Sequence, residues 1–244
     1  MRIFGCQPTY NSRMTSPESE GSLDSLDAIP LFPLPNVVLF PRAILPLHIF
    51  EERYRQMTKD VLSGDGRLAM ALLKHGWEKD YYSRPEIEPV VCVGKIVSWE
   101  KLPDGKYNFL LQGQQRARVV KETKDASGVR LYRVAKLEPM PETPTLEIDL
   151  EQERKRLSRV FGTGSLAALP LAKHFREMAQ TGMSTAEIAD IAAFTFLEDV
   201  ALKQELLEES DVTRRVRTVI GALEGMNVQF NPAMRGLPAD PGEN

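Results

Sequence analysis

The sequence predicts an α+β protein in which a small, strongly bent β-sheet or barrel with one intervening helix precedes an α-helical bundle. Residues 28–140 contain at least six short runs with the two-residue period of strands, separated by prolines and glycines. Residues 141–146 belong to a proline-rich linker, and residues 147–225 change to helical spacing. So many strand and turn signals in one segment are typical of a sheet that curls on itself.

The first half begins with "AIPLFPLPNVVLFPRAILPLHIF", residues 28–50. Its five prolines exclude a helix and predict short strands near sheet edges, since proline cannot donate to a sheet ladder. A helix follows and ends at Gly64, because apolar residues recur there at helical spacing. That stripe consists of Phe50, Tyr54, Met57 and Val61. Residues 67–74 return to a strand, and residues 75–89 form a long polar and aromatic loop.

The stretch "VGKIVSWEKLPDGKYNFLLQGQQRARVV", residues 93–120, is predicted to form a wall of the barrel. A turn at Asp104 and Gly105 joins two strands, because glycine supplies the positive φ that such a turn needs. Gly94, Asp104, Gly105 and Gly113 are assigned as structural turn residues, and the glycines are expected to serve bends and close strand approach.

The second half carries explicit helix signals. Residues 184–187, Ser-Thr-Ala-Glu, are a capping box that opens a helix, and a bend is expected near residues 196–199. Asp211 is expected to cap the last helix, which Gly225 should end. The apolar stripe of that helix consists of Val212, Val216, Val219, Ile220 and Leu223.

The two ends of the chain are expected to be loose. Residues 1–27 are rich in Ser, Pro and acidic residues and are predicted to be a disordered extension, in which Met14 is a second candidate start. Residues 226–244 are predicted to be a loose tail. No run of about 18 apolar residues occurs, so no membrane span is expected. The two cysteines, Cys6 and Cys92, predict no disulfide framework and favour a reducing cytoplasm.

No residue pattern for catalysis or metal binding is found, so no enzyme activity, metal or cofactor is predicted. The three histidines are isolated, and no phosphate-binding loop or G-x-S-x-G motif occurs. Residues 162–167 match G-x-G-x-x-A, but a helix precedes them where a dinucleotide site needs a strand.

Two groups of residues are candidates for partner binding. Arg116 and Arg118 lie two apart and share a strand face, which is either a patch for an anionic ligand or, as we favour, a solvated face. Trp77, Tyr81 and Tyr82 crowd the loop and either contact a partner or fold back onto the barrel. Residues 28–140 hold 18 Lys and Arg against 13 Asp and Glu, although the whole chain has a net charge of −3.

Three blocks of sequence resemble the N-terminal, substrate-binding domain of Lon protease. The first is "IPLFPLPNVVLFPRAILPLHIFEERYRQM", with alternating Pro-Leu and Phe-Pro segments. The second is the stretch at residues 93–120, which ends in a Gly-x-x-Arg element at residues 113–116. The third is the helical half, with Lys-Gln-x-Leu-Leu-Glu at residues 203–208 before Asp211. The resemblance covers residues 28–225, in the family's order.

The resemblance implies a PUA-like β pseudo-barrel over residues 28–140 and a helical bundle over residues 147–225. It also implies a stand-alone member without the ATPase and protease domains of Lon. The function it predicts is that of a non-enzymatic polypeptide-binding or adaptor module in protein quality control. Such a module would bind unfolded or damaged segments and work with a separate protease or chaperone. The alternative is RNA binding by the barrel, which the net negative charge disfavours.

Overall fold

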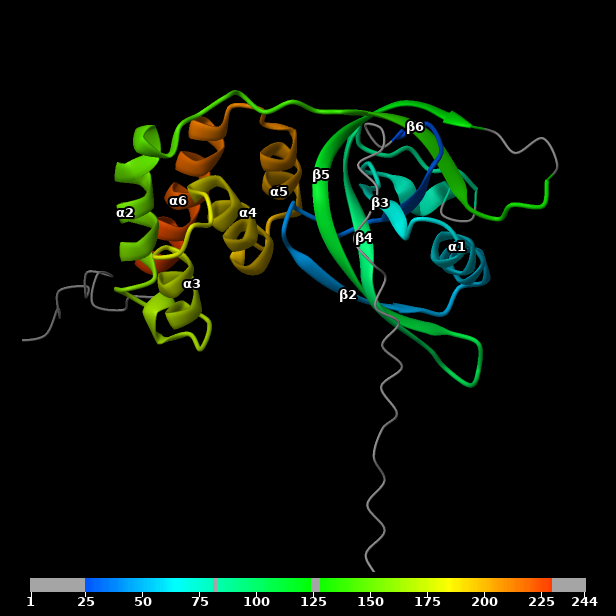
Figure 1. Ribbon diagram of the computed structural model, residues 1–244, viewed down its shortest axis with the longest axis horizontal. Coiled ribbons are helices and arrows are strands. Elements are labelled where there is room, and N and C mark those ends of the chain that lie inside the picture. Colours follow the sequence, from blue (N-terminus) through cyan, green and yellow to red (C-terminus); the bar gives the residue numbers. More distant parts are fainter. Residues whose placement is uncertain (1–24, 81–82, 124–127, 230–244) are drawn as a thin grey trace, which may run out of the picture.

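The computed structural model describes residues 25–80, 83–123 and 128–229, and these form two parts joined by an extended linker (Figure 1). A curled sheet with helix α1 on one side makes the first part, and helices α2–α6 make the second. The predicted α+β class, with strands first and helices last, is confirmed. Residues 1–24 of the predicted extension, residues 230–244 of the predicted tail and the pair Tyr81 and Tyr82 lie outside the described residues.

The sheet contains six strands within the described residues, in the order β2-β5-β4-β3-β1-β6. β5 also pairs with β6, so the pairings run from β5 through β4, β3, β1 and β6 back to β5, and β2 is attached to β5 outside this ring. The strand bounds are β1 Ile29–Leu34, β2 Ile44–Ile49, β3 Arg67–Leu72, β4 Val90–Lys101, β5 Tyr107–Thr123 and β6 Arg133–Pro139.

The proline-rich strand β1 is not an edge strand, which corrects the expectation from the sequence. It pairs with β6 along Ile29–Leu31 and with β3 along Leu31–Leu34. Only Leu31 therefore has neighbours on both sides, whereas Pro30 is paired only with β6 and Pro33 only with β3. Each proline thus has a side without a ladder partner, so its missing N–H need not interrupt the sheet.

Small residues fill the space between the ring strands. Ala69, Ala71, Ala117 and Ala135 are fully buried there with Leu31. A ring of so few strands has a narrow interior, so alanine and valine fit where larger side chains would force the strands apart.

Gly94 and Gly113 lie within strands, not in turns, which corrects their assignment as turn residues. They face each other across β4 and β5, beside a register shift between Val93 and Gly94. A Cβ on Gly113 would lie 2.0 Å from the carbonyl oxygen of Phe40. Gly105, in contrast, has φ +81° in the hairpin turn, and Asp104 Oδ1 accepts a hydrogen bond from the Lys106 amide at 3.1 Å.

The helices follow the local signals closely. Helix α1 is Glu52–Ser63, and the second part contains α2 Glu151–Val160, α3 Ala172–Met178, α4 Thr185–Phe196, α5 Val200–Glu208 and α6 Val212–Gln229. Short 3-10 turns are η1 Trp77–Asp80, η2 Glu147–Leu150 and η3 Leu166–Ala168. The capping box at Ser184 and Glu187 is confirmed, and Asp211 Oδ1 accepts from the Arg214 amide at 3.0 Å.

Two details of the helices differ from the expectation. Helix α6 continues through Gly225 to Gln229, because an exposed glycine weakens a helix by only about 1 kcal/mol and does not break it. Phe50 precedes α1 and is 60% exposed, so the buried stripe of that helix begins at Tyr54.

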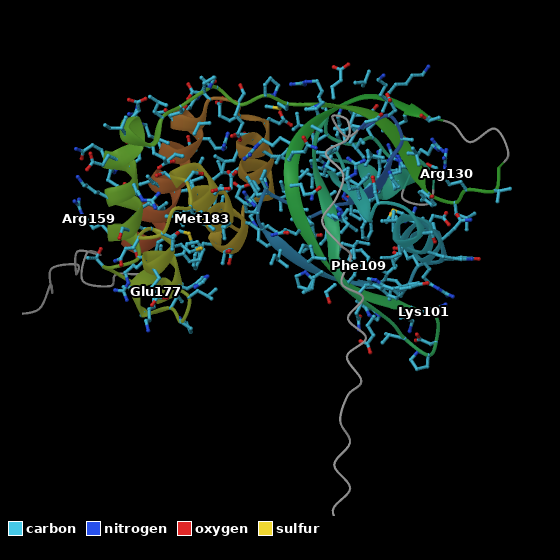
Figure 2. The ribbon with its side chains drawn as sticks, viewed as in Figure 1. Lys101, Phe109, Arg130, Arg159, Glu177 and Met183 are labelled. Atoms are coloured by element: carbon cyan, nitrogen blue, oxygen red, sulfur yellow. The ribbon has the colours of Figure 1, made fainter. Side chains whose placement is uncertain are left out.

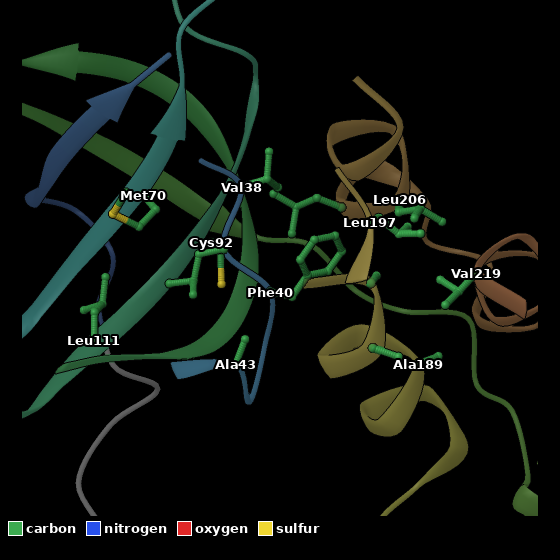
Figure 3. Packing of buried hydrophobic residues seen from close by; sticks show 14 of the residues in the cluster. Val38, Phe40, Ala43, Met70, Cys92, Leu111, Ala189, Leu197, Leu206 and Val219 are labelled. Carbon is green, nitrogen blue, oxygen red and sulfur yellow. The ribbon is translucent and has the colours of Figure 1, made fainter. Parts of the chain in front are cut away.

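One hydrophobic core continues from the sheet into the bundle. Figure 3 shows Phe40, in the segment between β1 and β2, extending from the side of Cys92 toward Leu197 and Leu206 of the helical part. The five apolar residues of the α6 stripe are all buried in the same core, as expected. The two parts therefore share buried surface and are held together by packing as well as by the linker.

Candidate functional site

Arg116 is buried where the sheet meets the helical bundle. Its side chain is 2% exposed, and its guanidinium lies 2.8 Å from Glu142 of the linker and 2.8 Å from Asp190 of α4. Arg215 at the start of α6 is fully buried and contacts the same two carboxylates, at 2.6 Å and 3.1 Å. Two arginines and two carboxylates thus form one network, which we call the interface network.

The interface network keeps Arg116 charged. Burial by itself lowers the pKa of the guanidinium, but the charge and hydrogen bond of Asp190, together with Glu142, outweigh it and raise the pKa above its ordinary value. Arg116 Nε also donates to the carbonyl of Leu207 in α5 at 3.1 Å. The expectation of a solvated face is therefore wrong for Arg116, because the bundle covers this part of β5. Arg118, two residues on, is exposed.

A second ion pair crosses the same junction. Arg42 Nε donates to Glu187 Oε1 at 2.7 Å, so the segment before β2 is tied to the capping box of α4. Both residues line a polar cleft of about 670 Å³ that also contains Arg116 and Asp190. Burial raises the pKa of Glu187, but hydrogen bonds from Ser184 and from Arg42 outweigh it, so the pKa lies below its ordinary value.

The Arg42–Glu187 pair should contribute stability that depends on pH. Because the pKa of Glu187 is lower in the folded state, its contribution is complete above the ordinary value of 4.5 and is lost as pH falls through the lowered pKa. We expect Arg42→Ala to cost up to about 1 kcal/mol at pH 7, since the pair is partly exposed. Urea unfolding at neutral and acidic pH measures this, and the cost should shrink in acid.

Arg118→Ala is the matched control for Arg42→Ala, because both arginines are exposed and only Arg42 pairs with Glu187. The control should change stability little at either pH. A cost for Arg42→Ala that stays the same in acid would show that the ion pair is not its source.

An open apolar groove lies at the other end of the sheet, and we call it the edge groove. Residues 46–48 of β2, 98–100 of β4 and 108–110 of β5 line its volume of about 410 Å³. Trp99 is 54% exposed and Leu110 is 38% exposed, and Ile44 nearby on β2 is 49% exposed. Figure 2 places Phe109 and Lys101 on the β4–β5 hairpin, away from the bundle that carries Arg159 and Glu177.

The edge groove borders an open strand edge. Within the described residues β2 pairs only with β5, so its other side has no strand neighbour. The exposed positions Ile44, Pro46 and His48 alternate with more buried ones along β2. His48 is held in place, because its Nδ1 lies 2.7 Å from Asn108 Oδ1 on β5.

The residues of the edge groove were not identified from the sequence, which assigned the stretch to a barrel wall. One signal could have found them. In β5, Leu110 lies between Asn108 and Gln112 at the positions where alternation calls for polar side chains. An apolar residue on the outward face of a strand is a sign of an exposed patch.

Trp77 lines a third cavity, of about 530 Å³, between the sheet and α5, which we call the α5 cleft. Trp77 is half-buried, so its ring contacts the protein and also borders the cavity. The cavity is also lined by Leu72, Leu73, Glu78, Glu88, Val200, Gln204, Glu205 and Glu208. The structure therefore does not bring Trp77 and Arg116 to one surface, because they line different cavities.

Among the described residues no three His, Cys, Asp or Glu side chains gather as metal ligands. Burial raises the pKa of the Cys92 thiol to about 12, so it is not an activated nucleophile. None of the described helices has the length and hydropathy of a membrane span.

The sequence is similar to parts of known Lon proteases. The curated relatives include Lon protease from Desulfosudis oleivorans, 26% identical over 203 residues, which are 83% of this chain and 24% of that protein. Lon protease of Escherichia coli (strain K12) is 27% identical over 200 residues, 80% of this chain and 24% of that protein. The chain thus spans about a quarter of the relatives it matches.

Two solved structures share the fold. The N-terminal domain of Mycobacterium avium complex Lon protease aligns with a TM-score of 0.62 at 17% identity, over 81% of this chain and 98% of that one. The Lon N-terminal domain protein from Xanthomonas campestris aligns with a TM-score of 0.56 at 21% identity, over 80% and 97%. The family model for the ATP-dependent protease La (LON) substrate-binding domain matches residues 28–225. Because this match covers most of the chain, the protein belongs to the ATP-dependent protease La (LON) substrate-binding domain family.

Proposed function

We propose that this protein is a non-enzymatic module that binds unfolded polypeptide segments, and that the edge groove is its binding site. The observation that carries the proposal is the exposed apolar surface of Trp99, Leu110 and Ile44 beside the open edge of β2. Membership of a substrate-binding domain family supports the same class of ligand.

The groove suits an extended chain physically. A polypeptide that lies along β2 could form main-chain hydrogen bonds with the open edge. Its alternating side chains would lie toward both faces of the sheet, with Leu110 on one face and Trp99, which pairs with Phe109, on the other. Pro46 removes one donor from β2, so the side-chain contacts should carry more of the affinity than the ladder does. An apolar contact of this kind recognises unfolded chains, because folded proteins keep such side chains inside.

Polypeptide binding is proposed ahead of RNA binding for an electrostatic reason. Two arginines that contribute to the positive charge of residues 28–140, Arg116 and Arg133, are buried in ion pairs and do not face solvent.

A partner protease or chaperone and a cytoplasmic location belong to the proposal too. The free, buried thiol of Cys92 fits a reducing compartment.

The proposal is tested with a labelled, permanently unfolded protein, reduced and carboxymethylated α-lactalbumin, titrated by fluorescence anisotropy. We expect saturable binding that changes little with salt, since the contact is apolar. The triple variant Ile44→Ala, Trp99→Ala, Leu110→Ala should weaken it by about tenfold or more, as loss of a central aromatic anchor does.

The matched control is Leu146→Ala with Ile148→Ala, which shortens two exposed aliphatic side chains elsewhere, 69% and 76% exposed. Its affinity should equal that of the unchanged protein. Equal binding by the triple variant would reject the edge groove as the site. Affinity for single-stranded RNA that falls steeply with salt, without affinity for the unfolded protein, would favour the RNA alternative.

A further inference from the structure

The α5 cleft contains a buried hydrogen-bond acceptor without a donor. Gln204 is 6% exposed, and its Nε2 donates to the Val90 carbonyl at 3.0 Å and to Glu208 Oε1 at 2.8 Å. Both partners are acceptors, so they fix the orientation of the amide and leave Gln204 Oε1 as the free atom. That oxygen has no hydrogen-bond partner in the described structure. Buried acceptors almost always have a donor, so a ligand or water is expected at this position.

The same cleft is acidic and partly apolar. Four carboxylates line it, from Glu78, Glu88, Glu205 and Glu208, and none forms an ion pair within the described part of the chain. Leu72, Leu73 and Val200 supply apolar surface, and Trp77 supplies an aromatic ring. A side chain that suits this lining has a positive charge, several N–H donors and an apolar stem. Arginine meets all three requirements, and its planar fork can stack on an indole ring.

We propose that the α5 cleft binds an arginine side chain of a polypeptide, with a guanidinium N–H donating to Gln204 Oε1 and the glutamates attracting its charge. This inference rests on the proposed polypeptide-binding function and adds a second subsite with its own preference. The cleft shares no lining residue with the edge groove. The protein therefore selects segments in which a basic residue accompanies apolar ones.

The probe is a short fluorescein-labelled peptide in which arginine alternates with leucine, compared with the same peptide carrying citrulline for arginine. Citrulline keeps the length and an N–H donor but lacks the charge, so the pair isolates the electrostatic contribution. We expect the arginine peptide to bind about fivefold tighter at low salt, and the difference to shrink as salt rises.

The variant is Glu88→Gln with Glu205→Gln, which removes two charges from the cleft and leaves the Gln204 hydrogen bonds in place. It should bind both peptides alike. The control, Glu52→Gln with Glu138→Gln, makes the same change in net charge at exposed positions outside the cleft and should keep the preference. Gln204→Met, which removes the acceptor, should lower affinity for both peptides, because citrulline keeps an N–H donor, once its fold is verified by circular dichroism.

The outcomes separate the two proposals. If the edge-groove triple variant weakens both peptides equally while the cleft variant abolishes only the preference, both proposals stand. Equal affinity of the unchanged protein for the two peptides, or no binding of either, would overturn the cleft assignment and leave a water as the partner of Gln204 Oε1. Loss of unfolded-protein binding alone bears only on the edge groove.

Discussion

Gly113→Ala is expected to destabilise the protein by more than about 4 kcal/mol or to prevent folding, which places it among the most damaging single substitutions. The added Cβ would lie 2.0 Å from the carbonyl oxygen of Phe40 and 2.8 Å from its carbonyl carbon. Neither atom can move away easily, because two backbone hydrogen bonds hold the segment. Arg42 N donates to Gly113 O at 2.8 Å, and Gly113 N donates to Ala43 O at 2.9 Å.

Gly221→Ala is the matched control for Gly113→Ala and should have the opposite sign. Gly221 lies inside α6, and a Cβ there would meet nothing within 4 Å. Alanine should therefore stabilise the helix by about 0.5–1 kcal/mol, since glycine loses more backbone freedom on folding. Urea unfolding followed by circular dichroism measures both variants. A Gly113→Ala protein that folds with nearly unchanged stability would refute the close approach of Phe40.

Asp190→Ala is expected to cost about 3–5 kcal/mol, because it leaves two buried arginines without the carboxylate that they share. Asp190 is 2% exposed and pairs with both Arg116 and Arg215. Glu142 remains, but its side chain is 40% exposed and cannot replace the buried partner. The loss should appear in urea unfolding at neutral pH.

A double-mutant cycle separates the ion pair from simple loss of packing. Arg116→Ala and Asp190→Ala, singly and together, should show a coupling of at least about 1 kcal/mol, because the two side chains are in direct contact. Arg118→Ala is the control on the same strand and should stay within about 0.5 kcal/mol of the unchanged protein. Additive costs for Arg116→Ala and Asp190→Ala would contradict the interface network as a coupled unit.

The interface network and the shared core fix the position of the helical bundle relative to the sheet, and this rigidity should affect binding. The edge groove is formed by the sheet, and the α5 cleft is formed jointly by the sheet and α5. A variant that loosens the junction should therefore impair the arginine preference of the α5 cleft before it impairs the edge groove. Asp190→Ala, if it folds at low temperature, offers this comparison with the same two peptides.

Local residue order determined much of this fold. The capping box at Ser184 and Glu187, the cap at Asp211 and the hairpin turn at Gly105 each depend on residues within a few positions of one another. Such features can be predicted from a sequence, because the groups that form hydrogen bonds with each other are neighbours in the chain. The apolar stripe of α6 could also be predicted, because helical periodicity shows which residues share a face.

Tertiary structure alone decided what covers each face. Arg116 and Arg118 carry the same periodic signal, yet one is buried against Asp190, 74 residues away, and the other faces solvent. The need for glycine at position 113 arises from Phe40, and the free acceptor of Gln204 arises from a strand carbonyl at Val90. Both candidate binding cavities are likewise bounded by segments distant in sequence. Their position depends on how strands and helices pack, and residue spacing within a single segment carries no record of that packing.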